Sequence, residues 1–111
     1  MPSISPKPSD RRTLTVGLAA FLLGGCAAAK PRTLHVTVAQ MAFTPKVLQA
    51  RVGDTVVWTN NDIVPHTATA AGGFDIDLPV KGGGQTALNR PGTIDYACSY
   101  HPSMTGRIVV T

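Results

Sequence analysis

Near the end of the chain stands the stretch Tyr96-Ala97-Cys98-Ser99-Tyr100-His101-Pro102-Ser103-Met104. Residues 93–98, Thr-Ile-Asp-Tyr-Ala-Cys, overlap the start of this stretch. Larger apolar side chains alternate there with small or polar ones, and this alternation predicts a strand. Ile94, Tyr96 and Cys98 then share one face of that strand, and Ile and Tyr belong inside a sheet protein. Cys98 is therefore expected to point inward at the end of the strand, just before a tight loop.

The loop after Cys98 supplies two more side chains that can bind a metal ion. His101 and Met104 follow in the pattern Cys-x-x-His-x-x-Met, and Pro102 stiffens the turn by fixing its own backbone angle. His66 lies 32 residues before Cys98, in another predicted loop. A thiolate, two imidazoles and a weak axial thioether are the donor set of blue-copper electron-transfer sites. We therefore predict one copper ion with His66, Cys98, His101 and Met104 as its ligands.

Each donor type suits a copper ion that gains and loses one electron. The soft thiolate of Cys98 stabilises Cu(I), the imidazoles bind both oxidation states, and a weak axial Met104 disfavours the square geometry of Cu(II). A rigid sheet scaffold would hold one geometry for both states. A copper-bound imidazole is neutral, and its second nitrogen usually has a hydrogen-bond partner. The sequence does not identify that partner.

The segments around this loop predict an all-β protein. Short apolar segments are separated by Gly, Pro, Asn and Asp, which are the residues of turns. The clearest strand is 55–59, Thr-Val-Val-Trp-Thr, and Asn60-Asn61-Asp62 ends it. Short strands at regular spacing favour an antiparallel β-sandwich or barrel. The other strands are expected near 34–38, 47–52, 68–71, 85–88, 93–98 and 107–111, and the glycines at 82–84 are expected to form a loop.

The first quarter of the chain has the character of an export signal. Two arginines precede a short apolar stretch over 14–23, and small residues follow it. The stretch is too short to span a bilayer, which takes about 20 apolar residues. Residues 23–26, Leu-Gly-Gly-Cys, resemble the bacterial lipobox, in which cleavage leaves Cys26 as a lipidated first residue. We therefore expect a signal peptide at 1–25, a lipidated tether at 26–32 and a folded domain at 33–111.

The net charge of +4 belongs to the predicted signal and tether. From Thr33 onward there are five basic and five acidic residues, so the predicted domain is neutral. Nucleic-acid binding needs clustered Lys and Arg on a folded face, so nucleic acid is not expected as a partner. The chain has two cysteines. If Cys26 is lipidated, Cys98 is a lone thiol, and a bound metal would protect it in an oxidising compartment.

These motifs resemble those of the cupredoxins, and the two-residue gaps of the Cys98–Met104 loop are most similar to the amicyanin group. The matching stretches spread over nearly all of residues 33–111: 41–45, 52–62, 65–67 and 96–110. The resemblance implies a Greek-key β-sandwich and a mononuclear type 1 copper. It also implies that the protein is an extracytoplasmic one-electron carrier and not an enzyme. By this likeness the strong ligands are His66, Cys98 and His101, and Met104 is the axial one.

Two positions depart from the family pattern. Many members have Asn directly after the first ligand histidine, where its side chain links the two ligand loops, and this chain has Thr67. Many also have Pro or Gly before the second histidine, and this chain has Tyr100. In the family the second histidine exposes its ring edge through an apolar patch where electrons pass. Here the candidates for that patch are Pro65, Tyr100, Pro102 and Met41.

Three other functions fit parts of the sequence. A copper storage or delivery protein would hold exchangeable Cu(I) in Met-rich segments, whereas only Met41 and Met104 follow the predicted signal. A metal-free binding module would not need the four ligands. An enzyme built on Cys98 and His101 would need a pocket and an orienting acid, and the sequence shows neither. We expect a monomeric carrier, anchored to a bacterial membrane by its lipid, that meets redox partner proteins transiently, with copper storage or delivery as the alternative.

Overall fold

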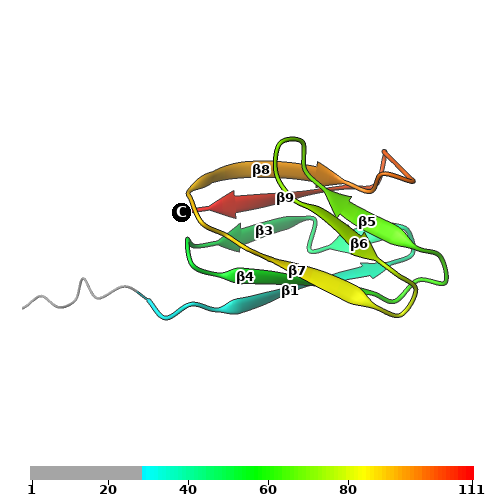
Figure 1. Cartoon of the computed structure of the whole chain (residues 1–111), viewed down its shortest axis with the longest axis horizontal. Helices are drawn as coiled ribbons and strands as arrows, with labels where there is room; N and C mark the ends of the chain where they lie inside the picture. The colour runs from blue at the N-terminus through cyan, green and yellow to red at the C-terminus, as the bar shows by residue number, and fades with distance from the viewer. Residues whose placement is uncertain (1–28) are drawn as a thin grey trace, which may run out of the picture.

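The computed structural model describes residues 29–111, so the predicted signal peptide and Cys26 lie outside the described residues. Within this range two sheets of strands pack face to face (Figure 1). The same part of the chain contains no helix that could cross a membrane. The strands are β1 (Thr33–Ala39), β2 (Ala42–Thr44), β3 (Val47–Ala50), β4 (Thr55–Asn60), β5 (His66–Thr69), β6 (Asp75–Leu78), β7 (Gly83–Ala87), β8 (Gly92–Ala97) and β9 (Thr105–Val110).

The two sheets have the strand orders β2-β1-β4-β7 and β3-β9-β8-β5-β6. The predicted all-β sandwich is confirmed, with one difference in strand direction. β1 pairs with β4 in parallel, and β3 pairs with β9 in parallel, so each sheet is mixed and not wholly antiparallel. Between β1 and β4 the chain crosses to the other sheet through β3, and such a crossover is what a parallel pair requires. Alternation within one strand carries no information about the direction of its neighbours.

The core between the sheets follows the predicted alternation. Trp58 on β4 is fully buried and its Nε1 donates a hydrogen bond to the Tyr96 hydroxyl at 3.2 Å, so two polar groups in the core satisfy each other. The ring of Tyr96 also packs edge-on against Phe43, with centroids 4.7 Å apart. Gly106 pairs with Tyr96 across β8 and β9, and the tyrosine ring occupies the space that a side chain there would need. The predicted inward face of β8 is thereby confirmed.

Several predicted element bounds differ from the structure. The strand expected at 68–71 begins two residues earlier, at His66. Gly83 and Gly84, expected in a loop, belong to β7 and pair with Thr59 and Trp58. A Cβ on Gly83 would collide with the carbonyl of Trp58, so close approach of two backbones explains this glycine. β2 and β6 contain three and four residues, too few for a clear alternation.

The sandwich has two ends with different contents (Figure 1). One end carries the loops at 61–65 and 98–104, and we call it the ligand pole. At the other end β1 begins, β9 ends and the turn at 51–54 leads into β4, and we call it the terminal pole. The chain therefore enters and leaves the described domain at the end opposite the predicted ligands.

Candidate metal centre

Three of the four predicted ligands meet at the ligand pole. His66, Cys98 and His101 each offer one ligand atom, and these atoms lie within 4.8 Å of one another. Cys98 Sγ is 3.6 Å from His66 Nδ1 and 3.7 Å from His101 Nδ1. The five-stranded sheet causes this meeting. Thr69, the last residue of β5, pairs antiparallel with Ala97, the last residue of β8, so the start of β5 with His66 extends past the end of β8 toward the loop that follows it.

Backbone hydrogen bonds close the loop that carries the other ligands. The N–H of His101 donates to the Cys98 carbonyl at 3.3 Å, and the N–H of Met104 donates to the His101 carbonyl at 2.9 Å. The N–H of Cys98 in turn donates to the Met104 carbonyl at 3.0 Å. Met104, the fourth predicted ligand, is buried on this same tight loop. Its part as the axial ligand stays a prediction.

Asp62 is the histidine partner that the sequence did not identify. Its Oδ2 lies 2.7 Å from Nε2 of His66, while Nδ1 of the same ring faces Cys98. With the proton on Nε2, the ring presents a lone pair on Nδ1 to a metal. Asp62 also accepts the backbone N–H groups of Gln40 at 2.7 Å and Met41 at 3.0 Å. The signal available in the sequence was a carboxylate four residues before a predicted ligand histidine.

The environment of Cys98 favours the thiolate, which is the form that binds metals. The side chain is fully buried, and burial alone would raise the pKa of the thiol. Hydrogen bonds from the Thr67 N–H (3.4 Å) and from the Tyr100 backbone, together with the two histidine rings beside the sulfur, outweigh burial, and the pKa of the thiol is lowered to about 6. One soft thiolate beside two imidazoles is a donor set that fits copper.

The surface of the ligand pole is rich in exposed apolar side chains. His66 is buried, whereas His101 is partly exposed. The four patch residues predicted from the sequence, Pro65, Tyr100, Pro102 and Met41, are all exposed. Sequence reasoning missed two more, Ile63 (84% exposed) and Val64 (37% exposed), which directly precede Pro65. Two apolar residues in a loop that leads into a ligand histidine were the available signal.

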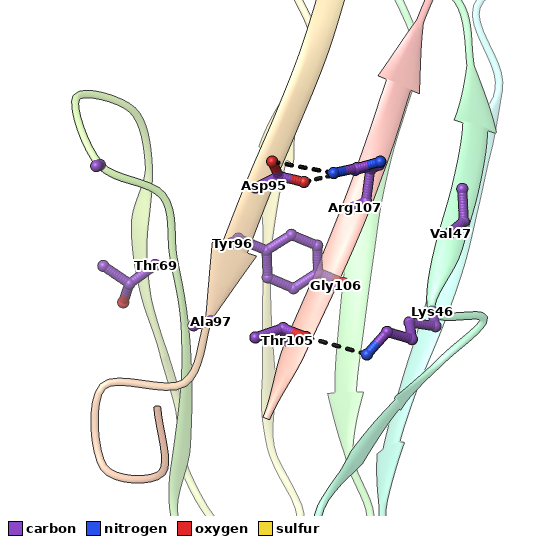
Figure 2. Close-up of a pocket in the computed structure, with 10 residues that line it drawn as sticks. Lys46, Val47, Thr69, Asp95, Tyr96, Ala97, Thr105, Gly106 and Arg107 are labelled. Atoms are coloured by element: carbon purple, nitrogen blue, oxygen red, sulfur yellow. Dashed lines mark hydrogen bonds and ion pairs between the residues drawn. The ribbon is translucent and has the colours of Figure 1, made fainter. Parts of the chain in front are cut away.

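A groove of about 660 Å³ lies elsewhere, on the outer face of the five-stranded sheet (Figure 2). Charged side chains in its walls are paired with neighbouring groups. Arg107 Nε donates to Asp95 Oδ1 at 2.6 Å, and Lys46 Nζ donates to Thr105 Oγ1 at 3.1 Å. Thr69 also lines this groove, and its hydroxyl contacts Thr67 beside the ligands.

Fold and donor set together define a β-sandwich protein with one site whose donors fit a single copper ion. A family model described as a cupredoxin-like domain matches residues 13–110. Amicyanin-alpha of Methylorubrum extorquens is 34% identical over 103 residues, which cover 86% of this chain and 87% of the relative. Amicyanin of Paracoccus denitrificans is 33% identical over 82 residues, which cover 68% of this chain and 63% of the relative.

Solved structures of amicyanin variants are similar to this chain as well. An amicyanin variant in the reduced state matches with a TM-score of 0.67 and 29% identity, over 71% of this chain and 82% of that chain. The Cu(I) form of another amicyanin variant matches with a TM-score of 0.68 and 28% identity, over the same shares of 71% and 82%. The chain belongs to the cupredoxin-like family. The predicted fold, copper as the metal and one-electron transport in place of catalysis are confirmed.

Proposed function

We propose that this chain carries single electrons between redox proteins outside the cytoplasm, with one copper ion held by His66, Cys98 and His101 and with Met104 as its weak axial ligand. The observation that carries the proposal is the cluster itself, three donor atoms within 4.8 Å at one end of a rigid sandwich. When bound, copper supplies a one-electron couple between Cu(I) and Cu(II).

The part played by the protein is to fix the donors in advance. Asp62 orients the ring of His66, and the N–H of Thr67 points at Cys98 Sγ. Backbone hydrogen bonds within 98–104 fix the position of His101. Ligands held in this way need little rearrangement when the charge of the site changes, and this suits repeated electron transfer.

The partly exposed ring of His101 is the proposed point of electron exchange. Exposed apolar side chains precede His66 and flank His101, as an interaction site for other proteins would require. Transient redox encounters use small interfaces. The neutral charge of residues 33–111 implies little long-range steering of the partner.

The proposed location rests on the N-terminal sequence. A basic head, a short apolar stretch and the Leu-Gly-Gly-Cys motif support export and lipidation at Cys26, which would anchor the domain to a bacterial membrane. The full chain should then fractionate with membranes, and Cys26→Ser should move it to the soluble fraction. Recovery of both forms in the soluble fraction would remove the anchor from the proposal.

A visible spectrum of the soluble 27–111 fragment tests the carrier function. Titration with Cu(II) should produce a strong red-absorbing band that saturates at one copper per chain. The band should bleach with a reductant and return with an oxidant without loss of copper. Copper released on reduction would instead support the alternative, a storage or delivery protein. A chain that stays colourless would contradict both the copper site and the carrier function.

A further inference from the structure

Three hydroxyl groups lie together where β5 meets the loop at 98–104. Thr67 Oγ1 is 2.9 Å from Thr69 Oγ1 and 3.2 Å from Ser99 Oγ, and Ser99 Oγ is 3.1 Å from Thr69 Oγ1. Asp75 on β6 completes the group, because the Thr69 hydroxyl donates to its Oδ1 at 2.8 Å. We call Thr67, Thr69, Ser99 and Asp75 the hydroxyl cluster.

Asp75 sets the direction of the hydrogen bonds in this cluster. Each hydroxyl has one proton to donate, and an ionised carboxylate can only accept. The proton of Thr69 therefore goes to Asp75, and Thr69 acts as the acceptor toward Ser99, while the proton of Thr67 goes to Ser99 Oγ. The hydroxyl protons of the cluster thus form a chain that runs from Thr67 through Ser99 and Thr69 to Asp75. A lone pair of Thr67 Oγ1 is left facing the backbone of the loop at 98–104.

That lone pair accepts a hydrogen bond from Ser99, the residue after Cys98. The backbone N–H of Ser99 donates to Thr67 Oγ1 at 2.8 Å. The backbone N–H of Thr67 donates to Cys98 Sγ at 3.4 Å. Thr67 therefore holds Cys98 at two points, its sulfur and the peptide that follows it. In this chain a hydroxyl in this cluster links the two ligand loops, where many cupredoxins use the amide of an asparagine.

We infer that Thr69 and Asp75 are positioning residues for the copper site, which act through Thr67 and Ser99 to hold the N–H of Thr67 on the Cys98 sulfur. The inference rests on the proposed function and deepens it. A hydrogen bond to the thiolate sulfur disperses its negative charge and so favours the more electron-rich Cu(I) state. Weakening the cluster should therefore lower the reduction potential.

The first test needs no metal. In the copper-free protein, Thr69→Val should raise the hydrogen-exchange rate of the Ser99 amide by about fivefold, the effect of one weakened hydrogen bond. Thr69→Ser keeps the hydroxyl and should leave that rate near the wild-type value. The amide of Gly53, bonded to the Leu88 carbonyl at 2.8 Å at the terminal pole, should not change and so controls for global destabilisation.

The second test measures the reduction potential of the copper-loaded protein. In a fixed redox buffer, Thr69→Val should lower the ratio of Cu(I) to Cu(II) by about fivefold and shift the energy of the red band, whereas Thr69→Ser should restore both. Asp75→Asn removes a negative charge and leaves the Thr69 hydroxyl only an amide oxygen, which is a weaker acceptor than a carboxylate. Asp77→Asn, on the same strand and also exposed, controls for the charge. Asp75→Asn should give a lower ratio of Cu(I) to Cu(II) than Asp77→Asn.

The outcomes separate this inference from the proposed function. A wild-type protein that binds copper and is blue, with unchanged Ser99 exchange and unchanged potential in Thr69→Val, would overturn the positioning role alone. Equal potentials in Asp75→Asn and Asp77→Asn would reduce Asp75 to a simple charge and overturn its part. A colourless wild-type protein would overturn the copper function and this inference with it.

Discussion

At each pole of the sandwich an aspartate connects the segments beside β1 and β4, but the two aspartates have different roles. β1 and β4 run in parallel, and an aspartate beside β4 bonds to the chain beside β1 at each end of the pair. At the terminal pole Asp54 accepts the N–H of Arg32 at 2.9 Å and its guanidinium at 2.7 Å. At the ligand pole Asp62 accepts the N–H groups of Gln40 and Met41.

The difference lies in the remaining partner of each carboxylate. Asp54 receives a guanidinium and the N–H of Arg51, so all of its bonds secure the start of the domain. Asp62 receives the Nε2 of His66, which is a proposed copper ligand. Asp54 only connects the segments beside β1 and β4. Asp62 makes the same kind of connection and also binds a histidine of the proposed metal site. Substitutions at the two poles should therefore separate stability from copper chemistry.

The largest effect is expected from Cys98→Ser, which changes the ligand pole alone. An alcohol cannot supply the soft anionic donor, so the red band should disappear completely. The visible spectrum with saturating Cu(II) measures this loss, and circular dichroism should show that the sheets are intact. A variant that kept the full charge-transfer band would contradict the ligand assignment.

Asp62→Asn should come next, because it changes the ligand pole without removing a ligand. An amide nitrogen turned toward His66 would favour the proton on Nδ1, where the metal needs a lone pair. Loss of such a partner typically costs about 10–100-fold in metal affinity. Competition with a copper chelator measures the change, and Asp77→Asn is the matched control for charge. Wild-type affinity in Asp62→Asn would show that Asp62 only secures the backbone of Gln40 and Met41.

Met104→Leu should alter the redox balance and leave both carboxylate contacts intact. Loss of the axial donor to Cu(II) should keep the blue band but raise the reduction potential, by about 59 mV for each tenfold rise in the ratio of Cu(I) to Cu(II). We expect a rise of at least about one such step. Voltammetry measures the potential, and an unchanged value would exclude Met104 from the set of ligands.

Asp54→Asn should have the smallest effect on copper and should act on stability alone. Hydrogen bonding from Arg32 outweighs burial and holds the pKa of Asp54 below its usual value. A carboxylate with a depressed pKa stabilises the fold above about pH 4, and this stability is lost as the pH falls further.

At pH 7 Asp54→Asn should therefore lower the melting temperature by roughly 5–10 °C, with the blue band unchanged. The difference from the wild type should shrink as the pH falls below about 4. Thermal unfolding at several pH values measures both. A pH-independent difference would mean that the charge of Asp54 does not contribute to stability.

Candidate ligands could be predicted from the sequence, whereas the residues that support them could not. Cys98, His101 and Met104 come from one short loop, so their spacing carries the information. The role of Asp62 depends on contacts with residues 21 and 22 positions away. Those residues, Gln40 and Met41, have positive φ angles of 52° and 61°. No local sequence pattern predicted this backbone conformation.

The same distinction explains the other differences. The strand directions depend on crossovers between sheets, and Gly83 reflects an approach of β7 to β4, so neither is a local property. Thr67 stood out from the family pattern in the sequence. Its substitute function became visible only when the fold brought Thr69, Ser99 and Asp75 to it. Residue type and spacing pointed to the proposed donors, whereas long-range geometry was needed to find the side chains that support them.

If Cys26 is lipidated as proposed, the position of Arg32 at the terminal pole would limit the distance between the copper site and the membrane. Because Asp54 binds Arg32, a lipidated Cys26 would be joined to the domain by the five residues 27–31, whose fully extended length is about 17 Å. β1 alone, with seven residues, adds about 23 Å toward the ligand pole. The electron-exchange surface would then face the aqueous space at a limited height above the bilayer. Such a carrier would search for partners by lateral diffusion, and it would select those that are soluble or that project their own redox centre to the same height.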